Sequence, residues 1–132
     1  MPALVSRAFQ PTVLLVEDDE LDLDAMTRTF VRHGYLVLSA RSGHDAMSLI
    51  HTPLQPIDVV ILDLNLPDVG GVDLCARIRE LHPTLPVVVC TGSTDPADAV
   101  GLMNMGVRRF FYKPVAMADL LASVEGTLSC TG

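Results

Sequence analysis

The sequence has no apolar run that approaches the roughly 20 residues a helix needs to cross a lipid bilayer. Its first ten residues, MPALVSRAFQ, are too short and too weakly apolar for a secretory signal peptide, so residues 1–10 are expected to form a loose leader. Positive charge is also scarce, because nine Lys and Arg residues face sixteen Asp and Glu residues and the net charge is −7. This balance argues against direct binding to nucleic acid or to an anionic membrane surface.

Cysteine is rare as well. Cys75, Cys90 and Cys130 are odd in number and have no C-x-x-C spacing. They therefore predict neither a disulfide framework nor a zinc site. Unpaired thiols suit a reducing compartment, so we expect a cytoplasmic protein in which Cys90 is a small core residue rather than a redox sensor.

The chain does contain enough apolar sequence for one packed core. Hydrophobic residues make up 49% of its 132 residues, which is typical of globular rather than disordered proteins. A chain of this length predicts one domain. We place that domain at residues 11–129, followed by a short tail at residues 130–132.

Apolar runs bounded by turn residues alternate with segments of helical periodicity. Five strands and five helices in alternation predict an α/β fold with a parallel sheet covered on both faces, because each parallel crossover needs a connecting helix. We expect the doubly wound, flavodoxin-like arrangement with strand order 2-1-3-4-5. The expected strands span residues 12–16, 35–40, 57–64, 86–90 and 108–112, and the expected helices span about 21–33, 43–50, 72–81, 96–105 and 117–128.

Several helix ends are marked by residues with a known preference for them. We expect Gly34 to end the first helix, Ser42 to cap the second, and Asp95 with Pro96 to begin the fourth. The fourth helix has apolar residues on more than one face and Gly101 in its middle, so two interpretations stay open. We slightly favour a deeply packed helix over a loosely held helix with an apolar surface for a partner.

Polar side chains follow four of the five strands, at the points where the strands end. In a doubly wound sheet the functional groups lie outside the carboxyl ends of the strands, so these side chains are expected to converge on one pocket. Clustered carboxylates repel each other unless a cation lies among them, and hard oxygen ligands suit Mg²⁺. The side chains concerned are those of Glu17, Asp18, Asp63, Thr91 and Lys113, and the backbone amide of Gly92 follows Thr91.

The non-acidic members of this set favour an anionic ligand. Lys113 offers a point positive charge for a carboxylate or a phosphate oxygen. The Thr91 hydroxyl and the Gly92 amide can both donate hydrogen bonds to an anion. Together with a metal ion these groups meet the needs of phosphoryl transfer, in which catalysis is mostly positioning and charge neutralisation.

Four sequence blocks carry a family resemblance: VLLVEDDE, VVILDLNLPDVGG, VVVCTG and FFYKP. In this order, at the ends of the first, third, fourth and fifth strands, they resemble the signature blocks of response regulator receiver domains. These domains act in two-component phosphorelay signalling, and the likeness is to the chemotaxis-regulator type. It extends from about Pro11 to Leu128 and implies a signalling module that assists its own phosphorylation and dephosphorylation, not a metabolic enzyme.

The resemblance implies a role for each matching residue. Asp63 would accept a phosphoryl group from the phosphohistidine of a sensor histidine kinase or a histidine phosphotransfer protein. Asp18 would bind Mg²⁺ directly and Glu17 would help through a water molecule. Asp63 and the backbone carbonyl of Asn65 would complete the metal ligands.

The remaining implied roles concern the phosphorylated state. Lys113 would pair first with the acceptor carboxylate and then with the phosphate, its position fixed by a cis bond to Pro114. Gly92 would contact the phosphate. Thr91 would move its hydroxyl onto the phosphate and Phe110 would turn inward, so that the face formed by the fourth helix, fifth strand and fifth helix reports the change.

Two other functional classes stay open. A receiver-like scaffold would bind partners without phosphorylation, although the intact acidic residues, Thr91 and Lys113 argue against it. A phosphatase with an aspartate nucleophile would need a second acid two residues after Asp63, where this chain has Asn65. The sequence does not specify the cognate kinase, a downstream protein or output domain, a homodimer through the switching face, the phosphate lifetime, or whether the receiver stands alone.

Overall fold

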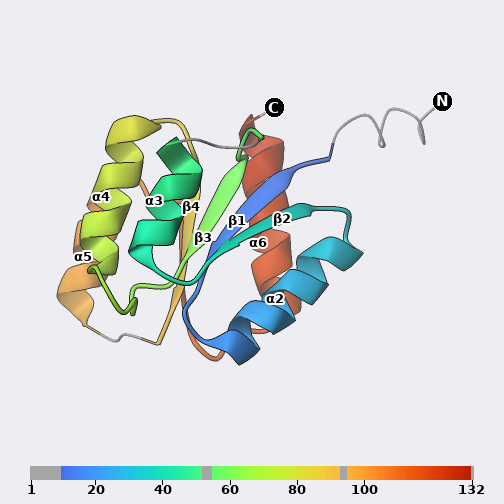
Figure 1. Cartoon of the computed structure of the whole chain (residues 1–132), viewed down its shortest axis with the longest axis horizontal. Helices are drawn as coiled ribbons and strands as arrows, with labels where there is room; N and C mark the ends of the chain where they lie inside the picture. Colours follow the sequence, from blue (N-terminus) through green and yellow to red (C-terminus); the bar gives the residue numbers. More distant parts are fainter. Residues whose placement is uncertain (1–9, 52–54, 93–94, 132) are drawn as a thin grey trace.

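The structure, a computed structural model, describes residues 10–51, 55–92 and 95–131 (Figure 1). The expected leader, except for Gln10, and Gly132 of the expected tail lie outside these residues. The strands are β1 (Thr12–Val16), β2 (Leu36–Ala40), β3 (Val59–Leu62), β4 (Val87–Thr91) and β5 (Arg109–Tyr112). The helices are α2 (Glu20–Arg32), α3 (Gly43–His51), α4 (Gly71–Leu81), α5 (Pro96–Asn104) and α6 (Met117–Thr131). Within the described ranges, none of these helices has the length and apolar character of a membrane span.

All five strands form one parallel sheet in the order β2-β1-β3-β4-β5. This order confirms the doubly wound, flavodoxin-like fold and places β2 at an edge. Figure 1 shows α2 and α6 on one face of the sheet and α3, α4 and α5 on the other. The sheet is therefore the middle of three layers, and the carboxyl ends of its strands meet at one edge.

Both faces of the central strands are buried, because successive side chains point to opposite sides. On β1, Leu14 and Val16 pack in the apolar cluster that faces α3, α4 and α5. Val13 and Leu15 pack in the cluster that faces α2 and α6. Each of the four is at most 1% exposed, and burying such a side chain stabilises the fold by about 1.5–3 kcal/mol. A continuous apolar run is what a strand between two helical layers requires.

The expected helix-end residues at Gly34 and Ser42 are confirmed. Gly34 follows α2 with a φ of +90°, a conformation that glycine adopts without strain. Ser42 accepts a hydrogen bond at its Oγ from the amide of Asp45, at 3.1 Å, in the first turn of α3. The turn at Gly34 also uses the amide of Tyr35, which donates to the carbonyl of Phe30 at 3.0 Å. For this reason β2 begins one residue later than predicted.

The favoured interpretation of the fourth helix, α5, is wrong. Asp95 caps this helix as expected, but among its residues only Leu102 is fully buried. Val100 and Met103 are 62% and 53% exposed. The helix is therefore not deeply packed, and it presents apolar side chains on its outer surface.

Gly71 begins α4 in close contact with the loop after β3. A Cβ at this position would overlap the backbone of Leu64, which cannot move without disturbing the strand before it. We expect Gly71→Ala to lower the free energy of unfolding by about 1–3 kcal/mol in urea unfolding. Gly101→Ala is the control with opposite sign, since among the described residues no atom lies within 4 Å of a Cβ at this position. This change should raise the free energy of unfolding by roughly 0.5–1 kcal/mol. Equal effects of the two changes would contradict the packing described here.

The thiols of Cys75 and Cys90 are core groups. Cys75 is 0% and Cys90 is 3% exposed, and burial raises the pKa of Cys90 to about 11. At pH 8 the Cys90 thiol is therefore protonated and inaccessible, and the thiolate is the reactive form. We expect iodoacetamide at pH 8 to leave both cysteines unmodified in the folded protein and to alkylate both in denaturant, as measured by peptide mass spectrometry. Fast alkylation of Cys90 in the folded protein would instead support a sensor role.

Candidate functional site

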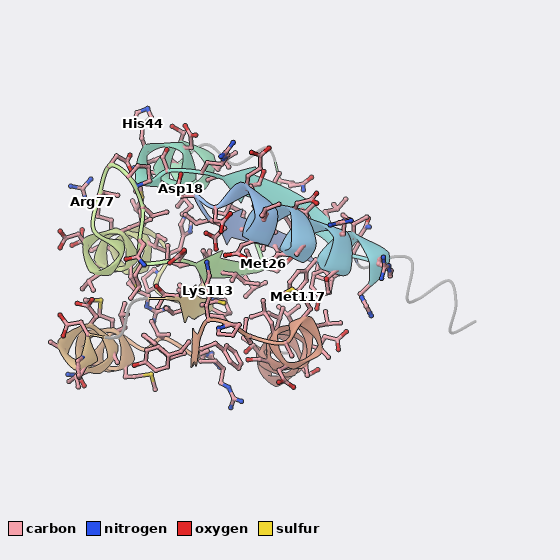
Figure 2. The ribbon with its side chains drawn as sticks, turned by 90° about the horizontal axis from the view of Figure 1, so that it is seen from below. Asp18, Met26, His44, Arg77, Lys113 and Met117 are labelled. Atoms are coloured by element: carbon pink, nitrogen blue, oxygen red, sulfur yellow. The ribbon has the colours of Figure 1, made fainter. Side chains whose placement is uncertain are left out.

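The backbone keeps the residues after the strand ends in register. The amide of Asp63 donates to the carbonyl of Val16 at 3.0 Å, and the amide of Lys113 donates to the carbonyl of Thr91 at 2.8 Å. Side chains far apart in the sequence therefore leave the sheet at the same edge. Figure 2 shows Lys113 in the middle of this edge and Asp18 in the loop between β1 and α2.

An ammonium group among three carboxylates is the centre of the site. Nζ of Lys113 donates to Oε1 of Glu17 at 2.7 Å, to Oδ2 of Asp22 at 2.8 Å and to Oδ2 of Asp63 at 3.0 Å. Glu17 is 1% and Asp63 is 5% exposed, so water cannot solvate their charges and Lys113 must balance them. An ammonium group has three N–H donors, and all three are engaged by carboxylates.

The second oxygen of Asp63 is held by different groups. Oδ1 accepts a hydrogen bond from Oγ1 of Thr91 at 2.8 Å and another from the amide of Asn65 at 3.1 Å. Thr91 is the last residue of β4 and is 0% exposed. Lys113 on one side and Thr91 on the other thus fix the orientation of the Asp63 carboxylate.

Burial affects the two inner carboxyl groups differently. It raises the pKa of Glu17 to about 7, a rise that Lys113 opposes and Asp63 increases. Burial also pushes the pKa of Asp63 upward, but hydrogen bonds from the Asn65 amide and from Glu17, Lys113 and Thr91 together hold that pKa below its ordinary value. At neutral pH Asp63 is therefore ionised and has electron pairs to share, whereas Glu17 is near the midpoint of its titration.

The charge of Lys113 is permanent at physiological pH. Burial alone would lower the pKa of this amine, but the hydrogen bonds to Asp22, Glu17 and Asp63 raise it well above its ordinary value. Lys113 therefore does not release a proton during a reaction in this site. What it can supply is positive charge and directed N–H donors.

The other expected site residues lie around this cluster. Asp18 is exposed, and its carboxylate has no partner among the described residues; Arg41 donates to its backbone carbonyl at 3.3 Å. Gly92 is exposed, and within the described ranges a Cβ there would meet no atom within 4 Å. A larger residue would therefore fit at this position. The peptide bond between Lys113 and Pro114 is cis, as expected.

Phe110 lies on β5, three residues before Lys113. It is half-buried against the apolar cluster of α3, α4 and α5. Its ring is inclined by 57° to that of Tyr112, with the ring centroids 5.0 Å apart. Phe110 is thus placed between the apolar interior and the exposed surface of β5.

The donor set fits Mg²⁺. Glu17 and Asp63 border the site, and the exposed Asp18 is a further carboxylate next to Glu17 in the chain, so the carboxylates outnumber the single lysine. In the part of the chain that the structure describes, no three His, Cys, Asp or Glu side chains form a ready metal cluster. Such a cluster is not required, because Mg²⁺ keeps several waters and takes one or two carboxylates.

Two acidic residues with specific hydrogen-bond partners, one in the site and one at the start of α3, were not predicted from the sequence. Asp22 follows no strand, and only the placement of the first turn of α2 beside the sheet edge brings it to Lys113. Asp68 lies in the loop after β3 and accepts hydrogen bonds from the amides of Gly43 and His44, at 2.8 and 2.9 Å. These two bonds lower the pKa of Asp68 and fix its loop to the start of α3.

Comparison with known proteins gives a consistent result. The response regulator receiver domain family matches residues 13–125. The transcriptional regulatory protein AfsQ1 of Streptomyces coelicolor is 33% identical over 118 residues, which are 89% of this chain and 51% of that protein. The transcriptional regulatory protein KdpE of Mycobacterium tuberculosis is 34% identical over 116 residues, which are 88% of this chain and 50% of that protein. The chain thus spans about half the length of these curated relatives.

The fold has close counterparts among solved structures. A CheY-like response regulator receiver domain protein from Methanospirillum hungatei superimposes with a TM-score of 0.87 at 26% identity, covering 92% of this chain and 95% of that one. A receiver protein from Pseudomonas putida gives a TM-score of 0.83 at 31% identity, covering 89% and 98%. The family match covers most of the described domain, and the sheet order is the one expected for that family. The chain therefore belongs to the response regulator receiver domain family of two-component signalling.

Proposed function

We propose that this receiver domain accepts a phosphoryl group on Asp63 from the phosphohistidine of a sensor histidine kinase or a histidine phosphotransfer protein, in a Mg²⁺-dependent reaction in the cytoplasm. The observation that carries the proposal is the state of the Asp63 carboxylate. It is 5% exposed, its pKa is low, and it is held between Lys113 and Thr91. A buried, oriented carboxylate that stays ionised suits nucleophilic attack on phosphorus.

The transfer exchanges one bond for another. An oxygen of Asp63 forms a bond to phosphorus while the bond between phosphorus and the donor imidazole nitrogen breaks. The nitrogen leaves with the bonding electron pair, and an imidazole protonated at its other nitrogen becomes a neutral histidine. The product on this chain is an acyl phosphate, which water can later hydrolyse to restore Asp63.

The residues around Asp63 have supporting roles. Lys113 holds the acceptor carboxylate and then pairs with a phosphoryl oxygen, and the Thr91 hydroxyl moves its hydrogen bond from Asp63 to the phosphate. The Gly92 amide is a further donor. When bound, Mg²⁺ supplies positive charge that neutralises the oxygens of the transferring group; Asp18, Glu17, Asp63 and the carbonyl of Asn65 would hold it.

The proposed output surface is the face of α5, β5 and α6. Movement of Thr91 toward the phosphate would free space into which Phe110 turns, and this would change the packing around Tyr112. The same face carries the exposed apolar side chains of Val100 and Met103 on α5. We assign to it a downstream protein, an output domain or a second copy of this receiver. The relatives AfsQ1 and KdpE are named transcriptional regulatory proteins, which supports an output domain as one of these partners.

Phosphorylation by a small donor tests the proposal. The wild-type protein should be labelled by radioactive acetyl phosphate at millimolar Mg²⁺ and should lose this labelling in EDTA. Absence of labelling at any Mg²⁺ concentration would favour the constitutive scaffold. Repeated turnover of a phosphomonoester would favour the phosphatase, against which the amide of Asn65 counts because it cannot act as a general acid.

A further inference from the structure

Asp22 is the carboxylate around Lys113 that the proposed reaction does not use. It lies in the first turn of α2, and its Oδ2 accepts a hydrogen bond from Nζ of Lys113 at 2.8 Å. The contact lies between those to Glu17, at 2.7 Å, and to Asp63, at 3.0 Å. It therefore occupies a full third of the donor capacity of the ammonium group.

The phosphoryl group needs one of these three donors. Since every N–H of Lys113 already points to a carboxylate, a phosphoryl oxygen can bind the lysine only if one carboxylate gives way. Glu17 is 1% exposed, so its release would leave an unpaired buried carboxylate, which is costly. Asp63 loses its charge when it carries the phosphoryl group, and the N–H that Lys113 now gives to it passes to a phosphoryl oxygen. A second N–H of Lys113 for the doubly charged phosphoryl group must therefore come from Glu17 or Asp22.

Asp22 is the partner that can be released with the smallest loss. Its side chain is 43% exposed, compared with 6% for Asp63, so water can replace the lysine around its oxygens. Its place in the first turn of α2 also keeps it near the positive end of the helix dipole after release. The exchange therefore breaks an exposed ion pair rather than a buried one.

We infer that Asp22 is a positioning residue that holds Lys113 in the resting state and competes with the phosphoryl group for it. This inference rests on the proposed phosphorylation of Asp63. The Asp22–Lys113 pair opens when the site is loaded, and Asp22 thereby sets how tightly a phosphoryl group is held. Removal of its charge should make loading more favourable.

Beryllofluoride, a stable mimic of the phosphoryl group, tests this inference directly. At saturating Mg²⁺ we expect Asp22→Asn to reach half-saturation at a beryllofluoride concentration about two- to fivefold below that of wild type, the factor for an exposed ion pair. Binding is measured by fluorine NMR. Glu20→Gln is the matched control, because it removes one charge from the same helical turn and Glu20 is exposed. Asp22→Glu restores the charge and should behave like wild type.

Each outcome decides between the alternatives. Tighter binding in Asp22→Asn alone, with thermal stability equal to that of Glu20→Gln, supports the exchange. Equal tightening in Glu20→Gln would overturn it in favour of a general charge effect, and unchanged or weaker binding in Asp22→Asn would overturn it outright. If wild type binds no beryllofluoride at all, the proposed function fails and this inference falls with it.

Discussion

The Asp63→Asn variant is expected to take up no phosphoryl group from acetyl phosphate and Mg²⁺ under conditions that label the wild type. The amide oxygen of Asn is neutral and a poor nucleophile, so the labelling rate should fall on the order of 10³-fold or more. The fold should persist, because an amide oxygen can still accept the hydrogen bond that Thr91 now gives to Asp63 at 2.8 Å. Protein mass spectrometry measures the labelled fraction.

The other carboxyl group in the site is a weak substitute for Asp63. Glu17 has its pKa raised to about 7 by burial, so a large part of it is protonated at neutral pH and has no charge to attack phosphorus. Asp73→Asn is the matched control, because Asp73 is an exposed residue in the first turn of α4 and should have no effect on labelling. Labelling of Asp63→Asn at the wild-type rate would place the acceptor elsewhere.

The Lys113→Met variant is expected to lose about 2–4 kcal/mol of unfolding free energy at pH 8 in buffer without Mg²⁺. The change leaves Glu17 and Asp63 adjacent and buried without a balancing positive charge. The expected loss of unfolding free energy is smaller than for a fully buried ion pair, because the Lys113 side chain is 21% exposed. Urea unfolding followed by circular dichroism measures it.

The loss in Lys113→Met should shrink as the pH falls. Lys113 lowers the pKa of Glu17 in the wild type, where it is already about 7 against 4.5 for the free side chain. Without the lysine the pKa of Glu17 in the folded protein rises further. A carboxyl group whose pKa is raised by folding stabilises the protein below pH 4.5, and this stabilisation is lost as the pH rises through the pKa of the folded state. The deficit should therefore be largest at pH 8 and smaller at pH 5.

Arg28→Met is the control for this pH dependence. Arg28 pairs with Asp24 at 2.8 Å, but the two side chains are 69% and 59% exposed. Water solvates both charges, so the loss should stay within about 0.5 kcal/mol at either pH. A deficit in Lys113→Met that is equal at pH 5 and pH 8, or as small as that of Arg28→Met, would contradict the charge balance described here.

The sequence was sufficient to predict the fold because the strands and the pocket follow from local patterns. Apolar runs such as TVLLV can be buried on both faces only between two helical layers, and β1 lies between them. Since the sheet is parallel, the side chains after the strand ends had to meet at one edge. Glu17, Asp63 and Lys113 do meet there, with Thr91 bonded to Asp63.

What the sequence could not predict depends on how helices sit on the sheet. Asp22 lies inside a helical pattern, and nothing in its neighbours indicates that the first turn of α2 reaches Lys113. The apolar residues of α5 gave no indication of which side would be covered. In the structure Leu102 is buried while Val100 is 62% exposed, so the outer face stays open. Both outcomes depend on how the helical layers pack against the sheet, and local sequence periodicity does not specify this packing.

The most direct measurement is the chemical location of the phosphoryl group. Reduction with borohydride converts an aspartyl phosphate into homoserine, which tandem mass spectrometry of peptides can place at one residue. We expect homoserine at position 63 in wild-type protein treated with acetyl phosphate and Mg²⁺, and none when Mg²⁺ is chelated. Homoserine at another position, or a phosphoryl group that resists reduction because it lies on a hydroxyl, would contradict the account.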